Sequence, residues 1–308
     1  MFFNQNQLSK YTFNKQLNFI FLKFFSNQFL QLKYNKSQNQ IGQQDLSDVF
    51  DSLKNFSKLT SFYLGLSTNQ INDENVQIIG NALNACNSLS DLILSLCQNQ
   101  ISSQGAFKLG SSLGKCMSLT RLLLNLSYNK ITEEGTQRLV QALASCNSLQ
   151  YFELKLMKNK IGGQNLSAIG SAFTKYLNLS KLTLIFNENQ IGDHGAYELV
   201  SALSKSDKIV RLNLSFYKNQ ITNEGAYNIG QALAKFTNLL SLELNLSINQ
   251  IDFNGALNLC SALEHIFTLS TLVLNLWLKI DHYNDSQKFK IRRKVLKFKR
   301  LINNKIYL

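Results

Sequence analysis

The sequence predicts an α/β solenoid, in which a short strand, a turn and a helix recur along most of the chain. Three observations carry this prediction. An isoleucine returns every thirty residues, an asparagine precedes it by two positions, and leucines alternate before that asparagine. A fixed period of roughly 20–50 residues is typical of arrays whose units bury their cores against one another. We therefore expect about eight to nine βα units. The isoleucines are Ile41, Ile71, Ile101, Ile131, Ile161, Ile191, Ile221 and Ile251.

Each strand is expected just before the asparagine. In the unit that ends at Ile131, Leu122, Leu124 and Leu126 alternate with other residues. Alternation with a period of two is typical of a strand that buries one face. The intervening side chains should therefore point away from the core.

A polar turn and a helix are expected after each isoleucine. Leu139, Ala142, Leu143 and Cys146 have the spacing of residues that share one helical face. A column near the start of this helix contains only Gly, Asn and Asp, which suit either a left-handed backbone or a helix N-cap. Its members are Asp45, Asn75, Gly105, Gly135, Asn165, Gly195, Gly225 and Gly255.

Strands joined by helices must run parallel, with right-handed crossovers. Parallel strands lie ~4.8 Å apart, whereas packed helices need ~8–10 Å. This mismatch bends the array. We therefore expect a curved horseshoe, with the sheet on the concave face and the helices on the convex face.

The frame L-x-L-x-x-N-x-I, followed by the Gly column and a helix containing Ala-Leu, resembles the leucine-rich repeat family, specifically its ribonuclease-inhibitor-like class. The usual unit of that class is about two residues shorter, so the resemblance implies a third inward leucine and a longer strand. The abundance of Asn, Gln, Lys, Ile and Phe is similar to that of proteins from AT-rich genomes such as those of ciliates. The resemblance also implies a buried ladder of side-chain amides that bond turn backbone: Asn69, Asn99, Asn129, Asn159, Asn189, Asn219 and Asn249.

The repeat pattern breaks at both ends. We assign 1–29 to a degenerate N-terminal cap, 30–280 to the solenoid, and 281–308 to a basic C-terminal cap or tail. In this tail Ile291, Val295, Phe298 and Ile302 form a helical stripe among basic residues. Three roles are open: a cap over the last repeat, a segment at 288–302 that binds an acidic membrane surface, and a nuclear-localisation or RNA-binding patch.

The net charge of +13 is concentrated at the two ends of the chain. Residues 1–40 contain five Lys and no acidic residue, and residues 281–308 contain nine basic and two acidic residues. The span between them is nearly neutral, with 18 basic and 17 acidic residues. A nucleic-acid-binding solenoid would carry a basic stripe on its folded surface, so nucleic acid is not an expected partner.

No pattern of catalytic or metal-binding residues is present, so we expect neither an enzyme nor a cofactor or metal. Cys86, Cys116 and Cys146 stand thirty residues apart and are expected to be buried, although a row of reactive thiols is the alternative. The apolar stretch 17–25 lacks a small-residue cleavage site behind it. Because the cysteine pattern fits reducing surroundings, we expect a cytoplasmic location. We also expect a monomer.

Function is expected on the outward side chains of the strands. Aromatic residues and Arg often anchor interfaces, although exposed strand residues can be apolar through β-propensity alone. The main interpretation is a non-enzymatic scaffold that binds a protein partner on the concave face. The alternatives are a regulator of a small GTPase, because a GTPase-activating protein for Ran has similar repeats, and a lipid-associated structural protein that uses the basic tail. The candidate binding residues are an apolar cluster of Tyr63, Ile93, Leu123 and Tyr151, and a basic patch of Arg121, Lys155, Lys181 and Arg211.

Overall fold

A computed structural model describes residues 30–35, 50, 53, 57–277, 283–298 and 301–308. The N-terminal cap predicted for residues 1–29 lies outside these residues, as do Ile41 and Asp45. The account below concerns the described residues alone.

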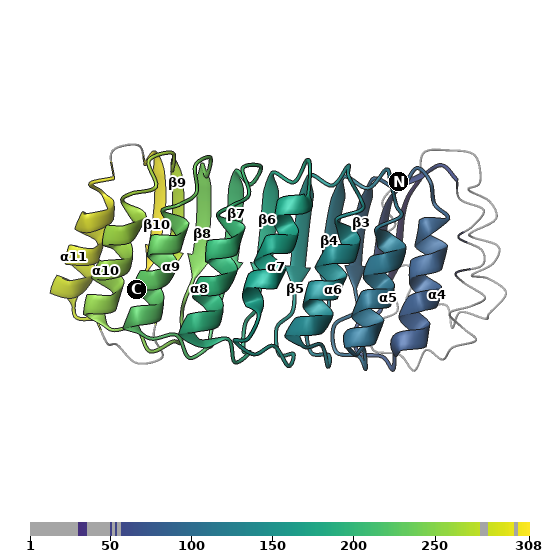
Figure 1. Ribbon diagram of the computed structural model, residues 1–308, viewed down its shortest axis with the longest axis horizontal. Coiled ribbons are helices and arrows are strands. Elements are labelled where there is room, and N and C mark those ends of the chain that lie inside the picture. Colours follow the sequence, from purple (N-terminus) through teal and green to yellow (C-terminus); the bar gives the residue numbers. More distant parts are fainter. Residues whose placement is uncertain (1–29, 36–49, 51–52, 54–56, 278–282, 299–300) are drawn as a thin grey trace, which may run out of the picture.

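Ten parallel strands form one open sheet, in which each strand pairs with the next strand along the chain. Figure 1 shows the sheet as a row behind a single layer of helices. The predicted βα solenoid is therefore confirmed. The strands are β1 (Leu30–Asn35), β2 (Leu59–Gly65), β3 (Asp91–Ser95), β4 (Arg121–Asn125), β5 (Tyr151–Lys155), β6 (Lys181–Ile185), β7 (Arg211–Ser215), β8 (Ser241–Asn245), β9 (Thr271–Asn275) and β10 (Asn303–Tyr307).

The helices cover one face of the sheet and leave the other face bare (Figure 1). Each helix from α4 to α10 contacts the next one along the chain, so the helices form a continuous outer layer. The helices are α4 (Asp73–Asn84), α5 (Ser103–Leu113), α6 (Glu133–Leu143), α7 (Leu166–Ala172), α8 (Gly192–Leu203), α9 (Asn223–Leu233), α10 (Phe253–Leu263) and α11 (Asp285–Val295), with a short 3-10 helix η1 (Phe173–Lys175) after α7.

The core lies between the sheet and the helices and runs the length of the array. Leu122 and Leu126 are fully buried, as is Leu139 from the facing helix. The predicted longer strand is wrong, because β4 has five residues and ends before Leu126. The backbone of Leu126 still pairs with the next repeat, since its N–H donates a hydrogen bond to the Lys155 carbonyl at 2.9 Å.

Immediately before each ladder asparagine the backbone is left-handed, for example at Tyr128 with φ 57° and at Ile248 with φ 55°. A β-branched residue rarely adopts this conformation. Because residues as different as Lys158 and Ile248 occupy the position, no residue type in the sequence indicates it.

At most of its positions the Gly column has neither of the two roles that the sequence allowed. Gly105, Gly135, Gly225 and Gly255 lie within the first turn of their helices and are not N-caps. The caps stand three residues earlier; the side chain of Asp252, for example, accepts hydrogen bonds from the N–H groups of Asn254 and Gly255. A Cβ atom on Gly225 would overlap the Asp193 side chain of the preceding unit. Close approach of neighbouring repeats therefore explains the glycines, and Asn165 alone in the column is left-handed, with φ 56°.

Residues 283–298 and 301–308 extend the same array. Helix α11 packs on α10, and β10 pairs in parallel with β9. Ile291, Val295 and Phe298 are buried, as the stripe predicts. Ile302 does not belong to this stripe, because the helix ends at Val295 and the Ile302 side chain is 80% exposed. Cap and solenoid thus share one sheet.

The cysteines give a direct test of the core. Cys86, Cys116, Cys146 and Cys260 are buried, and Cys97 is partly exposed. Burial raises the pKa of Cys86 to about 11 and that of Cys116 to about 12, which keeps these thiols protonated and unreactive. We expect a thiol reagent at mildly alkaline pH to modify a single site on the native chain, and Cys97→Ser to remove that reaction. Rapid modification of Cys116 would instead support the row of reactive thiols.

Candidate functional site

The bare face of the sheet carries rows of side chains that run across the strands. In the first row Tyr63 lies opposite Ile93, and Ile93 lies opposite Leu123. In the second row Arg121 lies opposite Tyr151, which is followed by Lys181 and Arg211. Each row thus brings together residues that are thirty positions apart in the sequence.

The apolar part of this face is smaller than predicted. Tyr63, Ile93 and Leu123 form a continuous row of partly exposed side chains on β2, β3 and β4. The row stops at β5, where Glu153 lies opposite Leu123. Tyr151 is in the neighbouring row and does not extend the apolar one. We call Tyr63, Ile93 and Leu123 the apolar row.

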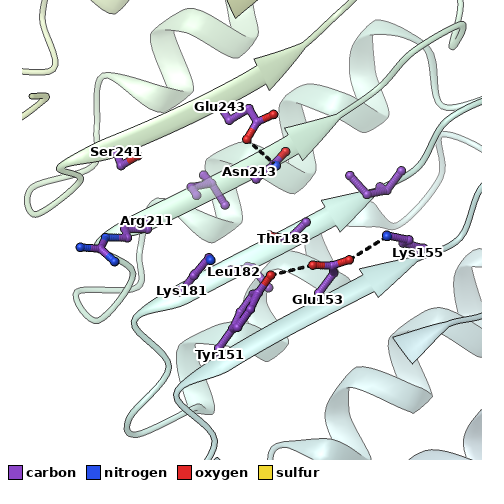
Figure 2. A pocket seen from close by; sticks show the side chains of 12 residues that line it. Tyr151, Glu153, Lys155, Lys181, Leu182, Thr183, Arg211, Asn213, Ser241 and Glu243 are labelled. Carbon is purple, nitrogen blue, oxygen red and sulfur yellow. Dashed lines mark hydrogen bonds and ion pairs between the residues drawn. The ribbon is translucent and has the colours of Figure 1, made fainter. Parts of the chain in front are cut away.

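Tyr151 is instead the centre of a polar cluster. Its hydroxyl donates a hydrogen bond to Glu153 Oε2 at 2.6 Å, and Lys155 Nζ lies 2.9 Å from Glu153 Oε1 (Figure 2). Lys181 Nζ lies 4.1 Å from the centre of the Tyr151 ring, and Arg121 Cζ lies 5.6 Å from it. Contacts of this kind are typical of cation–π attraction. The ring is therefore held between two cations.

These contacts shift the acidity of both groups at the centre of the cluster. Burial, followed by the bond to the Glu153 carboxylate, raises the pKa of Tyr151 to about 12. For Glu153, burial acts to raise the pKa, but the hydrogen bonds from Tyr151 and Lys155 outweigh it and lower the pKa below its ordinary value. At neutral pH Tyr151 is thus a hydrogen-bond donor and Glu153 is a carboxylate.

Two of the four residues of the predicted basic patch are neutralised by neighbouring acids. Arg121 Nη1 contacts both carboxylate oxygens of Asp91, at 2.7 and 3.0 Å, and Lys155 is paired with Glu153. Lys181 and Arg211 differ, because neither forms an ion pair with any residue that the structure describes. These two exposed cations lie directly opposite each other on β6 and β7. Like charges in this arrangement repel each other.

An open hollow of about 400 Å³ lies beside these two cations. Lys181 and Arg211 line one part of it, and Glu243 lines another (Figure 2). Asn213 Nδ2 donates to Glu243 Oε2 at 2.8 Å across β7 and β8. Asn213 and Glu243 are lining residues that the sequence analysis missed. A signal existed, because both stand in the column of Tyr63 and Leu123, and an acid thirty residues from an amide could have indicated the pair.

The ladder asparagines lie outside this face, in the turns that connect each strand to the helix that follows it. Asn99 Oδ1 accepts from the N–H groups of Ile71 and Asn69, at 3.0 and 3.2 Å, while Asn99 Nδ2 donates to the Leu66 and Leu96 carbonyls. One amide thus joins two consecutive repeats. Comparable bonds are made by Asn129, Asn159, Asn189, Asn219 and Asn249, whereas Asn69 Nδ2 bonds carbonyls of its own repeat.

Within the described ranges, no group of three His, Cys, Asp or Glu side chains is placed to hold a metal ion. The hollow offers cations, a carboxylate, an amide and an aromatic hydroxyl on rigid strands. This set can bind and orient a polar ligand. The one hydroxyl–carboxylate contact described above, between Tyr151 and Glu153, raises the pKa of the phenol to about 12, whereas an activated nucleophile has a lowered pKa.

The regular strands, the asparagine turns and the single helix layer define a solenoid of βα repeats with one bare sheet face. No family model and no curated protein matches the chain. Among solved structures, internalin C2 from Listeria monocytogenes is similar over 75% of this chain and 84% of that chain, with 22% identity and a TM-score of 0.40. TLR13, solved as a complex with ssRNA13, is similar over 92% of this chain, with 17% identity and a TM-score of 0.48. This chain spans 36% of the length of the TLR13 chain.

Proposed function

We propose that this chain is a non-enzymatic scaffold that binds a protein partner on the bare face of its sheet. The observation that carries the proposal is the pair of exposed cations, Lys181 and Arg211, on neighbouring strands. Their like charges repel each other, and neither forms an ion pair with a described residue, although the Glu153 carboxylate lies within electrostatic reach of Lys181. An acidic group of a partner in the hollow would relieve this repulsion.

The apolar row supplies the second part of the surface. Paired strands already fix the backbone of Tyr63, Ile93 and Leu123, so little backbone entropy is lost when a partner covers them. Apolar and aromatic anchors next to charged groups are typical of interface hot spots. The partner that suits this face has apolar side chains beside an acidic one.

Binding experiments with matched variants test the proposal. We expect a Tyr63→Ala, Ile93→Ala, Leu123→Ala triple variant, and separately a Lys181→Glu, Arg211→Glu double variant, to lose the partners that the wild-type chain captures from cell extract. The proposal also requires that a purified captured protein bind the wild-type chain directly, and at least about tenfold more tightly than it binds either variant.

Two control variants have the same chemistry on other surfaces. Met117, Leu177 and Phe267 are exposed in the turns after the helices, and their triple Ala variant should bind like the wild type. Lys205 and Lys235 are exposed and also thirty residues apart, so Lys205→Glu, Lys235→Glu controls for charge. Circular dichroism checks the fold of every variant. An unchanged partner list for both sheet-face variants would contradict the proposal.

The ribonuclease-inhibitor-like class, a monomeric state and a cytoplasmic location remain predictions from the sequence. The GTPase-regulator alternative also remains open, and a GTP-hydrolysis assay with candidate GTPases tests it.

A further inference from the structure

Helix α11 exposes an apolar stripe on the side opposite to its buried one. Ile291 and Val295 are fully buried, whereas Phe289 is 64% exposed and Leu296 is 68% exposed. Phe289 and Leu296 are seven positions apart, which places them on one helical face, with Arg293 between them. In Figure 1 this helix stands at the end of the row, where one of its flanks has no helical neighbour among the described residues.

Basic side chains surround this exposed stripe. Lys290, Arg292, Arg293 and Lys297 are exposed. Among the basic residues of this helix, Lys294 forms an ion pair with Glu264, at 2.6 Å. No ion pair is found for Arg292 or Arg293 within the described part of the chain. The stripe is therefore apolar at its centre and cationic at its margins.

The position of Arg292 distinguishes this helix from the others. Arg292 follows the N-cap Asn284 by the same interval at which Cys260 follows Asp252 and Gly230 follows Thr222. At that position an earlier helix packs closely against the helix of the next repeat. A Cβ on Gly230, for instance, would lie 2.7 Å from Ala262 Cβ. A long cation there opposes the stacking of a further helix or of a second copy of this face.

We propose that this face of α11, formed by Phe289, Leu296, Arg292, Arg293 and Lys297, binds an anionic lipid surface. The two apolar side chains would enter the boundary between headgroups and acyl chains, and the cations would contact the lipid headgroups. Attachment would be peripheral, because no described helix has the length and apolar character to span a bilayer. This inference is independent of the function proposed for the sheet face.

The geometry also corrects the membrane alternative drawn from the sequence. That alternative relied on the stripe of Ile291, Val295, Phe298 and Ile302. The first three of these side chains face the array and cannot reach a membrane, and Ile302 lies beyond the helix. The opposite face of α11, which carries Phe289 and Leu296, is exposed and can reach a membrane. Exposed Phe and Leu favour a lipid surface over double-stranded nucleic acid, because the phosphate backbone of a duplex offers cations a partner but offers these apolar side chains none.

Vesicle sedimentation with the full chain tests the proposal. We expect the wild type to sediment with vesicles of equal parts phosphatidylcholine and phosphatidylserine, and to remain in solution with phosphatidylcholine alone. Both Phe289→Ser, Leu296→Ser and Arg292→Glu, Arg293→Glu should weaken binding about tenfold or more. All four residues are exposed, so both variants should retain the circular dichroism spectrum of the wild type.

Matched controls change the same chemistry elsewhere. Leu177→Ser, Phe267→Ser removes two exposed apolar side chains from turns, and Lys205→Glu, Lys235→Glu reverses two exposed cations; both should bind vesicles like the wild type. The proposal is overturned if the wild type does not bind the anionic vesicles. It is also overturned if only the Arg variant loses binding and a single-stranded nucleic acid displaces the vesicles, since that outcome indicates a general polyanion site.

Discussion

Replacing Asn129 with alanine is expected to lower the free energy of unfolding by about 3 kcal/mol. Asn129 Oδ1 accepts the N–H of the fully buried Ile101 at 3.0 Å, and its Nδ2 donates to the carbonyls of Leu96, Leu126 and Ser127. The Leu96 and Leu126 carbonyls keep a second partner in the ladder, Asn99 and Asn159 respectively. The Ile101 N–H loses its acceptor, and a buried donor without a partner costs about 1–3 kcal/mol. Loss of the three donated bonds adds the rest.

Urea unfolding followed by circular dichroism measures this loss, and hydrogen exchange locates it. The Ile101 amide should exchange faster in the variant, because Asn129 Oδ1, the acceptor of its hydrogen bond, has been removed. Asn147 is exposed, so Asn147→Ala is the matched control and should leave the free energy of unfolding within about 0.5 kcal/mol of the wild type. Equal stability of the Asn129 variant and the wild type would show that the ladder does not hold the repeats together.

Replacing Gly110 with valine is the second large expected effect, a destabilisation of about 3 kcal/mol. A Cβ at this position would lie 2.7 Å from the Leu139 carbonyl oxygen and 3.0 Å from Leu139 Cα. Both are backbone atoms of α6, so relief requires movement of the whole helix. The core around Leu139 is fully buried and cannot follow that movement without loss of packing.

Thermal unfolding of the variant measures the effect. Gln141→Val places the same side chain on an exposed position of α6 and should cost only about 0.5 kcal/mol, the difference in helix propensity. Val140 occupies the equivalent position of α6 and is fully buried there. If Gly110→Val is tolerated as well as Gln141→Val, helix spacing does not explain the glycine.

The sheet-face site could be predicted as a set of residues but not as a set of interactions. Alternation placed Tyr63, Ile93 and Leu123 correctly on one row, because strand side chains alternate strictly between faces. Arg121, Lys155 and Lys181 looked equivalent in the sequence. In the structure the first two are paired with acids, and Lys181 covers the Tyr151 ring. These pairings depend on side-chain directions in neighbouring repeats, which the sequence spacing does not encode.

The sequence by itself determined the period, the order of strand, turn and helix, the inward columns and the ladder positions. It could do so because every unit of a stacked array has the same environment, so the same pattern of buried positions recurs in each repeat of the sequence. Tertiary structure alone decided that the strands stay short, that most helix-start glycines relieve contacts between repeats, and that α11 turns Phe289 and Leu296 outward. Each of these depends on the distance and orientation between units, and a residue pattern within one unit does not specify them.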